Sequence, residues 1–499
     1  MSDKVQNILK ASFWVLAVSW YSRVLSMLTV IILARNLDKH DFGILAGCFV
    51  IQSFFNAIAS TGVREFILRK ETITAEDINA AWTIHVSTRL LMALSIFGLS
   101  GYAADFMKIP EIGLLLKVMS LSAVFQGFQN LAIYIDMKKL RYSKPSLLGA
   151  ISKSVASTTS ISLAIIYQSY WAVVVSEVLF HAVYTIGTHV AYKHKLKFVS
   201  KNVFEQWQFS KWIILKGIVG YIKAAFDKII VSRNYPLGDL GLYNFSMEAA
   251  TTASKFIIQP LNKLIYPSLS DYVNDKRVLV DKVNKSLLVL SCVYIPIVFG
   301  GVYLSDILVP VVFGSKWSEA VPLFNIFLPM TFAGILVSAL TNVYTLTGKV
   351  KQQFWYEVIT SILFLMVMVP ASTLPLLDFA LCRQLVPYVL LLTIMLALQR
   401  TLPISIFKLL KLLFIPLMCS LFMILLLRFF SQLVTIDNDI VFLLVSICIG
   451  ALAYIVALVT MVVLSKGIVP ENDFLYKNFI LGFIGVSKRK LEQKRAKNG

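Results

Sequence analysis

Long apolar stretches separated by short polar segments run along almost the whole chain. A helix needs about 20 apolar residues to cross a bilayer, and its backbone groups must bond to one another because the hydrocarbon holds no water. The sequence therefore predicts an all-α integral membrane protein with about 14 transmembrane helices. We place these spans at 12–34, 42–63, 80–102, 112–135, 146–167, 170–190, 212–232, 241–262, 286–304, 321–346, 354–369, 376–398, 404–430 and 440–465. Pro370 and Pro375 predict the turn that divides the closest pair of spans.

One short polar motif occurs twice, 198 positions apart. Its copies are Arg35-Asn36 with Asp41 and Gly43, and Arg233-Asn234 with Asp239 and Gly241. Six predicted spans separate the copies, and an even number of spans preserves the orientation of a repeat. The pattern thus predicts two parallel six-helix repeats, in which 12–190 superposes on 212–398 by a rotation of about 180° around the membrane normal. This architecture is typical of transporters.

The repeat divides the chain into three predicted parts. Residues 1–200 form an N-terminal six-helix lobe, and residues 201–403 form a C-terminal six-helix lobe. Residues 404–499 add two further transmembrane helices and a basic cytoplasmic tail.

The distribution of basic residues predicts the orientation of the spans. If the N-terminus is cytoplasmic, the inside segments and adjoining span ends carry 32 of the 47 Lys and Arg residues, and the outside segments carry 5. Positively charged loops stay in the cytoplasm, so both termini are expected there. The net charge of +20 is then mostly topological. It predicts contact with anionic membrane lipids and requires no nucleic acid.

Composition and motifs argue against an enzyme. Hydrophobic residues make up 58% of the chain and charged residues 15%, and no loop is long enough for a soluble catalytic domain. The sequence has no GxxxxGK[ST] loop and no HExxH motif, and its five histidines are scattered. The five cysteines all fall within apolar spans and contain no CxxC. We therefore expect no catalytic residues, no cofactor and no metal site.

Basic side chains outnumber acidic ones within the predicted spans of the first lobe. A charge near the bilayer centre costs about 2.5–3.5 kcal/mol on insertion scales, so such side chains usually face a polar cavity or a charged partner. Arg23 lies at the midpoint of its span, and Arg89 and Lys153 lie beside serine and threonine residues. We expect these three to line a cationic cavity, although a structural salt bridge is the alternative for each. Glu177 is the only acid in the same spans.

In the second lobe the same reasoning leaves open whether the charged side chains line the cavity or form structural salt bridges. Lys223 and Asp227 are four residues apart and can pair on one helix face, as can Glu248 and Lys255, seven apart. Lys223, Asp227 and Lys255 are candidates for the cavity, but each base has an acid within reach. Snorkelling of a side chain near a helix end accounts for Lys117, Lys216, Glu357 and Arg428.

Several segments between residues 10 and 400 resemble one family of exporters. They are Arg23, Ile32 to Gly43, Gly62 to Lys70, Asp227 to Val231, Gly241 to Tyr243, Tyr266-Pro267 and Gly314 to Ala320. In order and spacing these resemble the polysaccharide transporter family (Wzx-type O-antigen and capsule flippases) of the multidrug/oligosaccharidyl-lipid/polysaccharide exporter superfamily. The resemblance implies two six-helix lobes forming a V and two extra C-terminal helices.

The resemblance also implies a cargo, a location and partners. The cargo is an undecaprenyl-diphosphate-linked oligosaccharide, moved from the cytoplasmic to the periplasmic leaflet of the bacterial inner membrane by alternating access. A downstream polymerase and a chain-length regulator are further expected partners. A surplus of positive charge in the first lobe agrees with this cargo, because arginine binds phosphate through paired hydrogen bonds.

Three other functions compete with a flippase. A multidrug or cation antiporter of the same superfamily shares the fold but should carry acids in its first-lobe cavity. A polymerase or ligase normally needs a large periplasmic loop, which this chain lacks. A sugar or peptide carrier with another twelve-helix fold has a similar topology.

The orientation is testable by labelling single cysteines in a cysteine-free background with a membrane-impermeant reagent. Because positive charge marks the cytoplasmic side, we expect a cysteine at Asn438 to be modified from outside the cell and one at Asn498 to be protected. The reverse pattern would contradict the orientation.

Overall fold

The computed structural model describes residues 3–70, 73–139, 141–194, 196–199, 203–270, 272–400, 402–434, 436–464 and 474. Its helices up to the second motif copy are α1 (Asp3–Asn36), α2 (Lys39–Ile58), α3 (Val63–Arg69), α4 (Ala75–Met107), α5 (Ile112–Gly127), α6 (Ile133–Lys138), α7 (Ser143–Tyr167), α8 (Trp171–Ala191) and α9 (Val203–Asn234). The later helices are α10 (Leu237–Ser270), α11 (Lys276–Tyr303), α12 (Ser305–Phe313), the 3-10 helix η1 (Ser315–Ala320), α13 (Val321–Leu346), α14 (Val350–Ala371), α15 (Leu376–Gln399), α16 (Ile406–Leu433) and α17 (Asp439–Leu464).

Each of the fourteen predicted spans overlaps at least one helix, and the described residues contain no strand. The prediction of an all-α membrane protein is therefore confirmed. Among the described residues, eleven helices are long and apolar enough to cross a membrane. The number of spans, fourteen, and the parallel repeat stay predictions. The turn predicted between Pro370 and Pro375 is present, because α14 ends at Ala371 and α15 begins at Leu376.

The helix predicted over 112–135 is wrong in its second half, because α5 ends at Gly127. Asn130 lies in the break and is completely buried. Its side chain accepts a hydrogen bond from the Ala132 amide at 3.1 Å and donates to the carbonyl oxygens of Tyr192 and His194 at 2.9 and 3.2 Å. These bonds replace helical ones, as buried polar groups require. The break leaves Gln126 in the last turn of α5.

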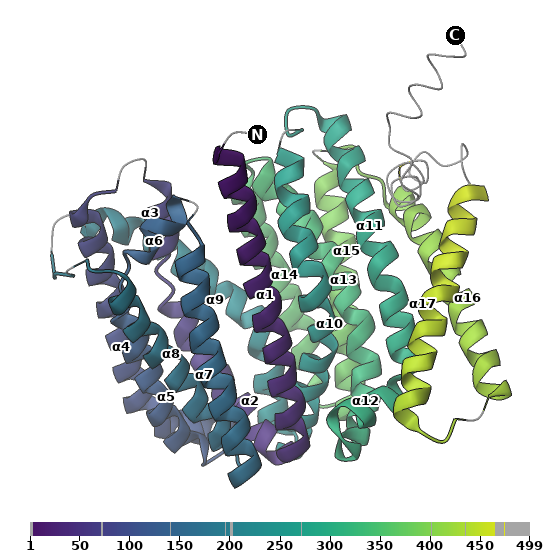
Figure 1. Ribbon diagram of the computed structural model, residues 1–499, viewed down its shortest axis with the longest axis horizontal. Helices are drawn as coiled ribbons and strands as arrows, with labels where there is room; N and C mark the ends of the chain where they lie inside the picture. The colour runs from purple at the N-terminus through teal and green to yellow at the C-terminus, as the bar shows by residue number, and fades with distance from the viewer. Residues whose placement is uncertain are drawn as a thin grey trace. The chain divides into compact units, whose positions relative to one another are not determined.

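By its internal contacts the chain forms two compact units. The first consists of Met1–Phe245 with Glu357–Phe379, and the second of Ser246–Tyr356 with Ala380–Gly499. In the first unit α4 packs against α5, and α7 packs against both α1 and α8 (Figure 1). In the second unit α11 packs against α13 and α16, and α16 packs against α17 (Figure 1).

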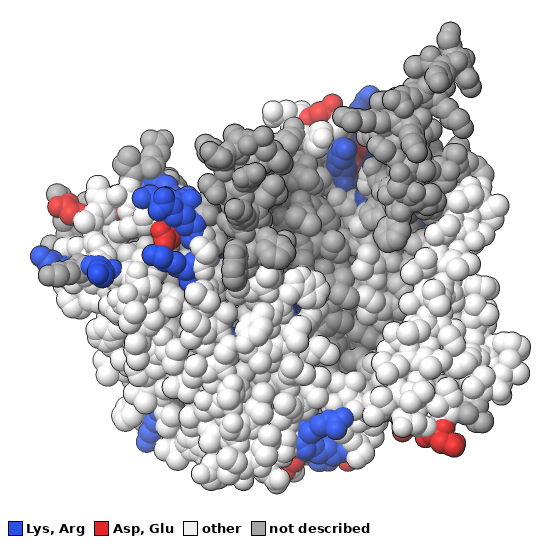
Figure 2. All heavy atoms as spheres, viewed as in Figure 1, with Lys and Arg blue, Asp and Glu red and all other residues white. Residues whose placement is uncertain are grey.

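The face drawn in Figure 2 shows where the charges of the described residues lie. Lys, Arg, Asp and Glu side chains gather toward the upper and lower edges of this view, and the described atoms between them are almost all uncharged. This distribution fits a protein whose middle layer contacts lipid, because charged side chains are costly in hydrocarbon.

The acids of the repeated motif begin helices. Asp41 N–H donates to Asp38 Oδ1 at 2.9 Å and Asp38 N–H donates to Asp41 Oδ2 at 3.2 Å, so the two form a capping box at the start of α2. Asp239 lies in the first turn of α10. An acid in the first turn interacts favourably with the free N–H groups there.

The glycines of the motif bring its two copies into direct contact. A methyl group added at Gly43 would overlap the carbonyl oxygen of Leu237, and one added at Gly241 would overlap the carbonyl oxygen of Lys39. Lys39 and Leu237 are themselves 198 positions apart, so the contact is reciprocal. The rings of Phe42 and Phe245 pack edge to face beside it, 5.7 Å apart. The first turns of α2 and α10 therefore approach as closely as only glycine permits.

Gly241→Ala and Gly43→Ala test this crossing. Each added methyl group must push two backbones apart, and we expect a loss of stability of about 1–3 kcal/mol and a lower melting temperature of the purified protein in detergent. Gly98→Ala on α4 is the matched control, because nothing lies within 4 Å of the position its methyl group takes. Equal melting temperatures for Gly241→Ala and Gly98→Ala would show that the close approach is not required.

Candidate functional site

Arg89 lies near the middle of α4, and only some of the hydrogen-bond donors of its guanidinium have partners. Its Nη1 donates to Asn56 Oδ1 on α2 at 2.7 Å and approaches the Met92 sulfur at 3.5 Å. Its Nε is buried and has no hydrogen-bond partner within the described part of the chain. A guanidinium has five N–H donors and always carries its charge. Arg89 therefore has donor capacity left for an anion.

Two histidines that the sequence analysis had treated as scattered are joined through Gln126. His85, one turn before Arg89 on α4, has its Nε2 2.9 Å from the Gln126 carbonyl oxygen. The side-chain amide nitrogen of Gln126 lies 3.1 Å from His181 Nε2 on α8. His181 Nε2 is also 3.2 Å from Glu177 Oε1. The four-residue spacing of Glu177 and His181 was the available signal in the sequence.

The cluster is held in place by contacts in the second half of α8 and just after its end. Thr185 Oγ1 donates to the Phe125 carbonyl oxygen at 2.7 Å, which fixes α8 against α5. Beyond the end of α8, the Tyr192 hydroxyl donates to Asp136 Oδ2 at 3.0 Å. Burial, together with this carboxylate, raises the pKa of Tyr192, so the tyrosine stays a neutral donor. Helices anchored in this way can present side chains in a fixed geometry.

Lys153 and Arg23 lie on neighbouring helices of the same unit. Lys153 is half-buried on α7 and lies within electrostatic reach of Glu177. The hydroxyls of Tyr21 on α1 and Ser154 on α7 are 2.7 Å apart, and Ser154 directly follows Lys153. Arg23, also half-buried, follows two residues after Tyr21. Around Glu177 the structure thus brings together Lys153 and His181, and Gln126 joins His181 to His85, one turn before Arg89 on α4.

Lys223 and Asp227 have partners on other helices. Lys223 Nζ donates to Glu357 Oε2 at 2.7 Å and to Thr360 Oγ1 at 2.8 Å, both on α14. Glu357 therefore takes part in an ion pair and is only 30% exposed, unlike the snorkelling side chain that was predicted. Asp227 is 1% exposed and accepts a hydrogen bond from the Tyr243 hydroxyl at 3.0 Å. These contacts favour structural roles for both residues.

Lys255 forms the ion pair expected from its spacing. Its Nζ donates to Glu248 Oε1 on the same face of α10, and about half of each side chain is exposed. An exposed pair of this kind contributes little to stability, about 0–1 kcal/mol in water.

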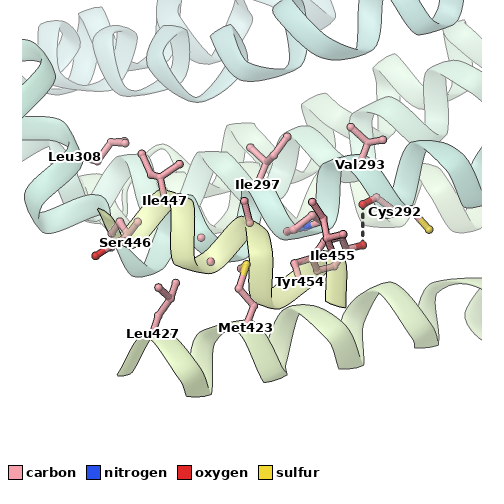
Figure 3. A pocket seen from close by; sticks show the side chains of 16 residues that line it. Cys292, Val293, Ile297, Leu308, Met423, Leu427, Ser446, Ile447, Tyr454 and Ile455 are labelled. Carbon is pink, nitrogen blue, oxygen red and sulfur yellow. Dashed lines mark hydrogen bonds between the residues drawn. The ribbon is translucent and has the colours of Figure 1, made fainter. Parts of the chain in front are cut away.

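The second unit contains an apolar cavity of about 450 Å³ between α11, α12, α16 and α17. Ile297, Leu308, Met423 and Ile447 point into it, and Tyr454 donates a hydrogen bond to the Cys292 carbonyl oxygen at 2.7 Å along one wall (Figure 3). No charged side chain lines this cavity. It suits hydrocarbon, and it cannot supply contacts to a phosphate.

A family model described as "Polysaccharide biosynthesis protein" matches residues 32–322, which is more than half of the chain. The chain belongs to this polysaccharide biosynthesis family. A relative in it is the lipopolysaccharide biosynthesis protein WzxC of Escherichia coli (strain K12), which is 22% identical over 350 residues, covering 68% of this chain and 70% of WzxC. The predicted resemblance to Wzx-type flippases is confirmed.

Two solved structures share the fold. The lipid II flippase MurJ, in an inward closed conformation, aligns with a TM-score of 0.72 at 16% identity, covering 93% of this chain and 99% of MurJ. An inward-facing multidrug resistance transporter of the MATE family aligns with a TM-score of 0.56 at 12% identity, covering 76% of this chain and 96% of the transporter. This chain therefore shares the fold of these two transporters.

Proposed function

We propose that this chain is a flippase that moves an undecaprenyl-diphosphate-linked oligosaccharide from the cytoplasmic to the periplasmic leaflet of the bacterial inner membrane. The observation that carries the proposal is Arg89, whose guanidinium keeps a buried N–H without a partner among the described residues. An unsatisfied donor in a membrane protein is costly, and a diphosphate oxygen would satisfy it. The names of WzxC and MurJ support a cargo of this class.

Arg23, Arg89 and Lys153 are the proposed cargo-binding residues. They belong to the predicted N-terminal lobe (1–200), which rocks against the predicted C-terminal lobe (201–403) while the helices of 404–499 add apolar surface for the polyprenyl tail. Contacts to other helices favour structural roles for Lys223 and Asp227, and Lys255 is already paired with Glu248 on its own helix. Both termini lie in the cytoplasm in this proposal. The transport takes its direction either from an ion gradient or from consumption of the product by a downstream polymerase with its chain-length regulator.

A multidrug or cation antiporter is the second candidate, because the MATE structure shares the fold. A cation carrier needs a carboxylate free to bind its cargo. In the described cluster Glu177 already lies 3.2 Å from His181, and Lys153 adds positive charge nearby. This balance of charge favours an anionic cargo.

Variants of the two arginines test the proposal in a strain that lacks the gene. Arg89→Gln and Arg23→Gln should each lower surface polysaccharide roughly tenfold to a hundredfold, because hydrogen bonds to charged groups contribute about 1.5–3 kcal/mol. In strains that carry these variants, the lipid-linked intermediate should accumulate in the cytoplasmic leaflet. Lysine at position 89 should restore part of the activity, because it keeps the charge and loses the paired geometry.

Protein abundance in the membrane separates binding from a structural role. Removing one partner of a buried pair costs about 3–5 kcal/mol, so a structural arginine would lower abundance and transport together. Arg428→Gln is the matched control, since Arg428 is an exposed arginine on α16. Full transport by the Arg23→Gln/Arg89→Gln double variant at normal abundance would refute the cationic site.

A further inference from the structure

Glu177 and His181 form a cluster that cargo binding alone does not explain. His181 lies at the midpoint of α8, and its side chain is 16% exposed. Its Nδ1 is buried without a hydrogen-bond partner among the described residues. A titratable pair at this depth is usually functional, because a charge there is costly.

One nitrogen of His181 faces two neighbours with opposite requirements. The Gln126 amide group, a donor, lies 3.1 Å from Nε2, and the Glu177 carboxylate, an acceptor, lies 3.2 Å from the same atom. An imidazole nitrogen either carries a proton or offers a lone pair. With a lone pair it accepts from Gln126, and with a proton it donates to Glu177. Whether Nε2 carries a proton therefore decides which neighbour His181 binds.

Gln126 connects this choice to Arg89. Its main-chain carbonyl oxygen accepts from Nε2–H of His85, one turn before Arg89 on α4. The next residue, Gly127, packs so closely on α4 that an added methyl group would lie 3.0 Å from Arg89 Cβ. Gln126 thus lies between His181 and the part of α4 that carries Arg89.

Other charged groups around the pair are few and mostly basic. Lys153 on α7 acts electrostatically on Glu177, and His85 and Arg89 face the cluster from α4 through Gln126. Tyr184 follows His181 on α8 and interacts with Tyr134 of α6. On α5, Lys117 stands over the Phe97 ring, more than two turns before Gln126. Glu177 is consequently the acid that can stabilise an imidazolium at His181.

We propose that Glu177 and His181 form a proton-binding site that is coupled to the binding of a diphosphate at Arg89. A proton from solvent binds to the Nε2 lone pair of the neutral imidazole, the new Nε2–H donates to Glu177, and the Gln126 side-chain amide is released. The added positive charge favours an anion at Arg89. Proton and diphosphate then strengthen each other's binding by the same factor, as linkage requires. The coupling rests on the proposed function, whereas the proton site does not.

Histidine NMR of the full-length protein in detergent micelles tests the proton site without cargo. The five histidine signals can be assigned by single His→Gln variants. We expect the His181 ring signal to change between about pH 7.5 and 5.5, and the change to be smaller in Glu177→Gln, because the variant removes the carboxylate that accepts from Nε2–H. An equal change in Glu177→Gln, or no change in wild type, would overturn the proposal.

The coupling is tested by the affinity of the purified protein for a short isoprenyl diphosphate between about pH 5.5 and 7.5, the range in which imidazole ordinarily changes charge. Wild type should bind at least about fivefold more tightly at the lower pH, and His181→Gln should bind equally at both. His189→Gln is the control, since His189 lies on the same helix, is exposed and contacts only the Phe128 carbonyl oxygen among the described residues.

The two experiments fail in distinguishable ways. If His181→Gln keeps the pH dependence of wild type, the coupling is refuted. If no variant binds the diphosphate at any pH, the proposed function and the coupling both fail, and the NMR titration alone decides whether the proton site exists.

Discussion

Hydrocarbon offers no hydrogen-bond partners, and this constraint governs the structure from its backbone to its candidate site. It requires each span to satisfy its own backbone, which is why the described chain is built from helices. It also makes every charge or polar group between the helix ends costly unless a partner is present. Within the membrane layer, each polar side chain is therefore either part of the architecture or available to a ligand.

Most of the intramembrane polar groups belong to the architecture. Lys223 is held by Glu357, Asp227 by Tyr243, and Asn130 replaces the helical hydrogen bonds lost where α5 ends. The cluster around Arg89 differs in its charge. Seven side chains have a buried polar atom without a partner in the described part of the chain, and of these only Arg89 and His181 can carry a charge. These two are the groups that a diphosphate or a proton would complete. The same constraint thus explains both the stable parts of the fold and the place where function is expected.

The sequence could predict the helices because apolar runs of about 20 residues permit little else in a membrane. It could also predict the importance of Gly43 and Gly241, because a motif that recurs at a fixed spacing indicates a shared structural role. It did not predict that the two glycines contact each other's helices, since that requires knowledge of helix packing.

The candidate site was predictable only in part. Arg89 stood out as a charge in the middle of a span, but its neighbours come from α2, α5 and α8, far apart in sequence. Gln126 joins the two histidines because α5 ends early, and nothing local in the sequence indicates that end. Lys223 was given a partner on its own helix by spacing, whereas the structure shows a glutamate of α14 134 residues away.

The most direct test of a diphosphate-dependent flippase is a transport measurement in proteoliposomes. Purified protein is reconstituted with an undecaprenyl-diphosphate-linked oligosaccharide, and a membrane-impermeant glycosidase is added outside. If the account is correct, wild type brings sugar from the inner leaflet within reach of the enzyme, and Arg89→Gln leaves it protected. If wild-type vesicles and protein-free vesicles expose the same fraction of sugar, or Arg89→Gln matches wild type, the account is contradicted.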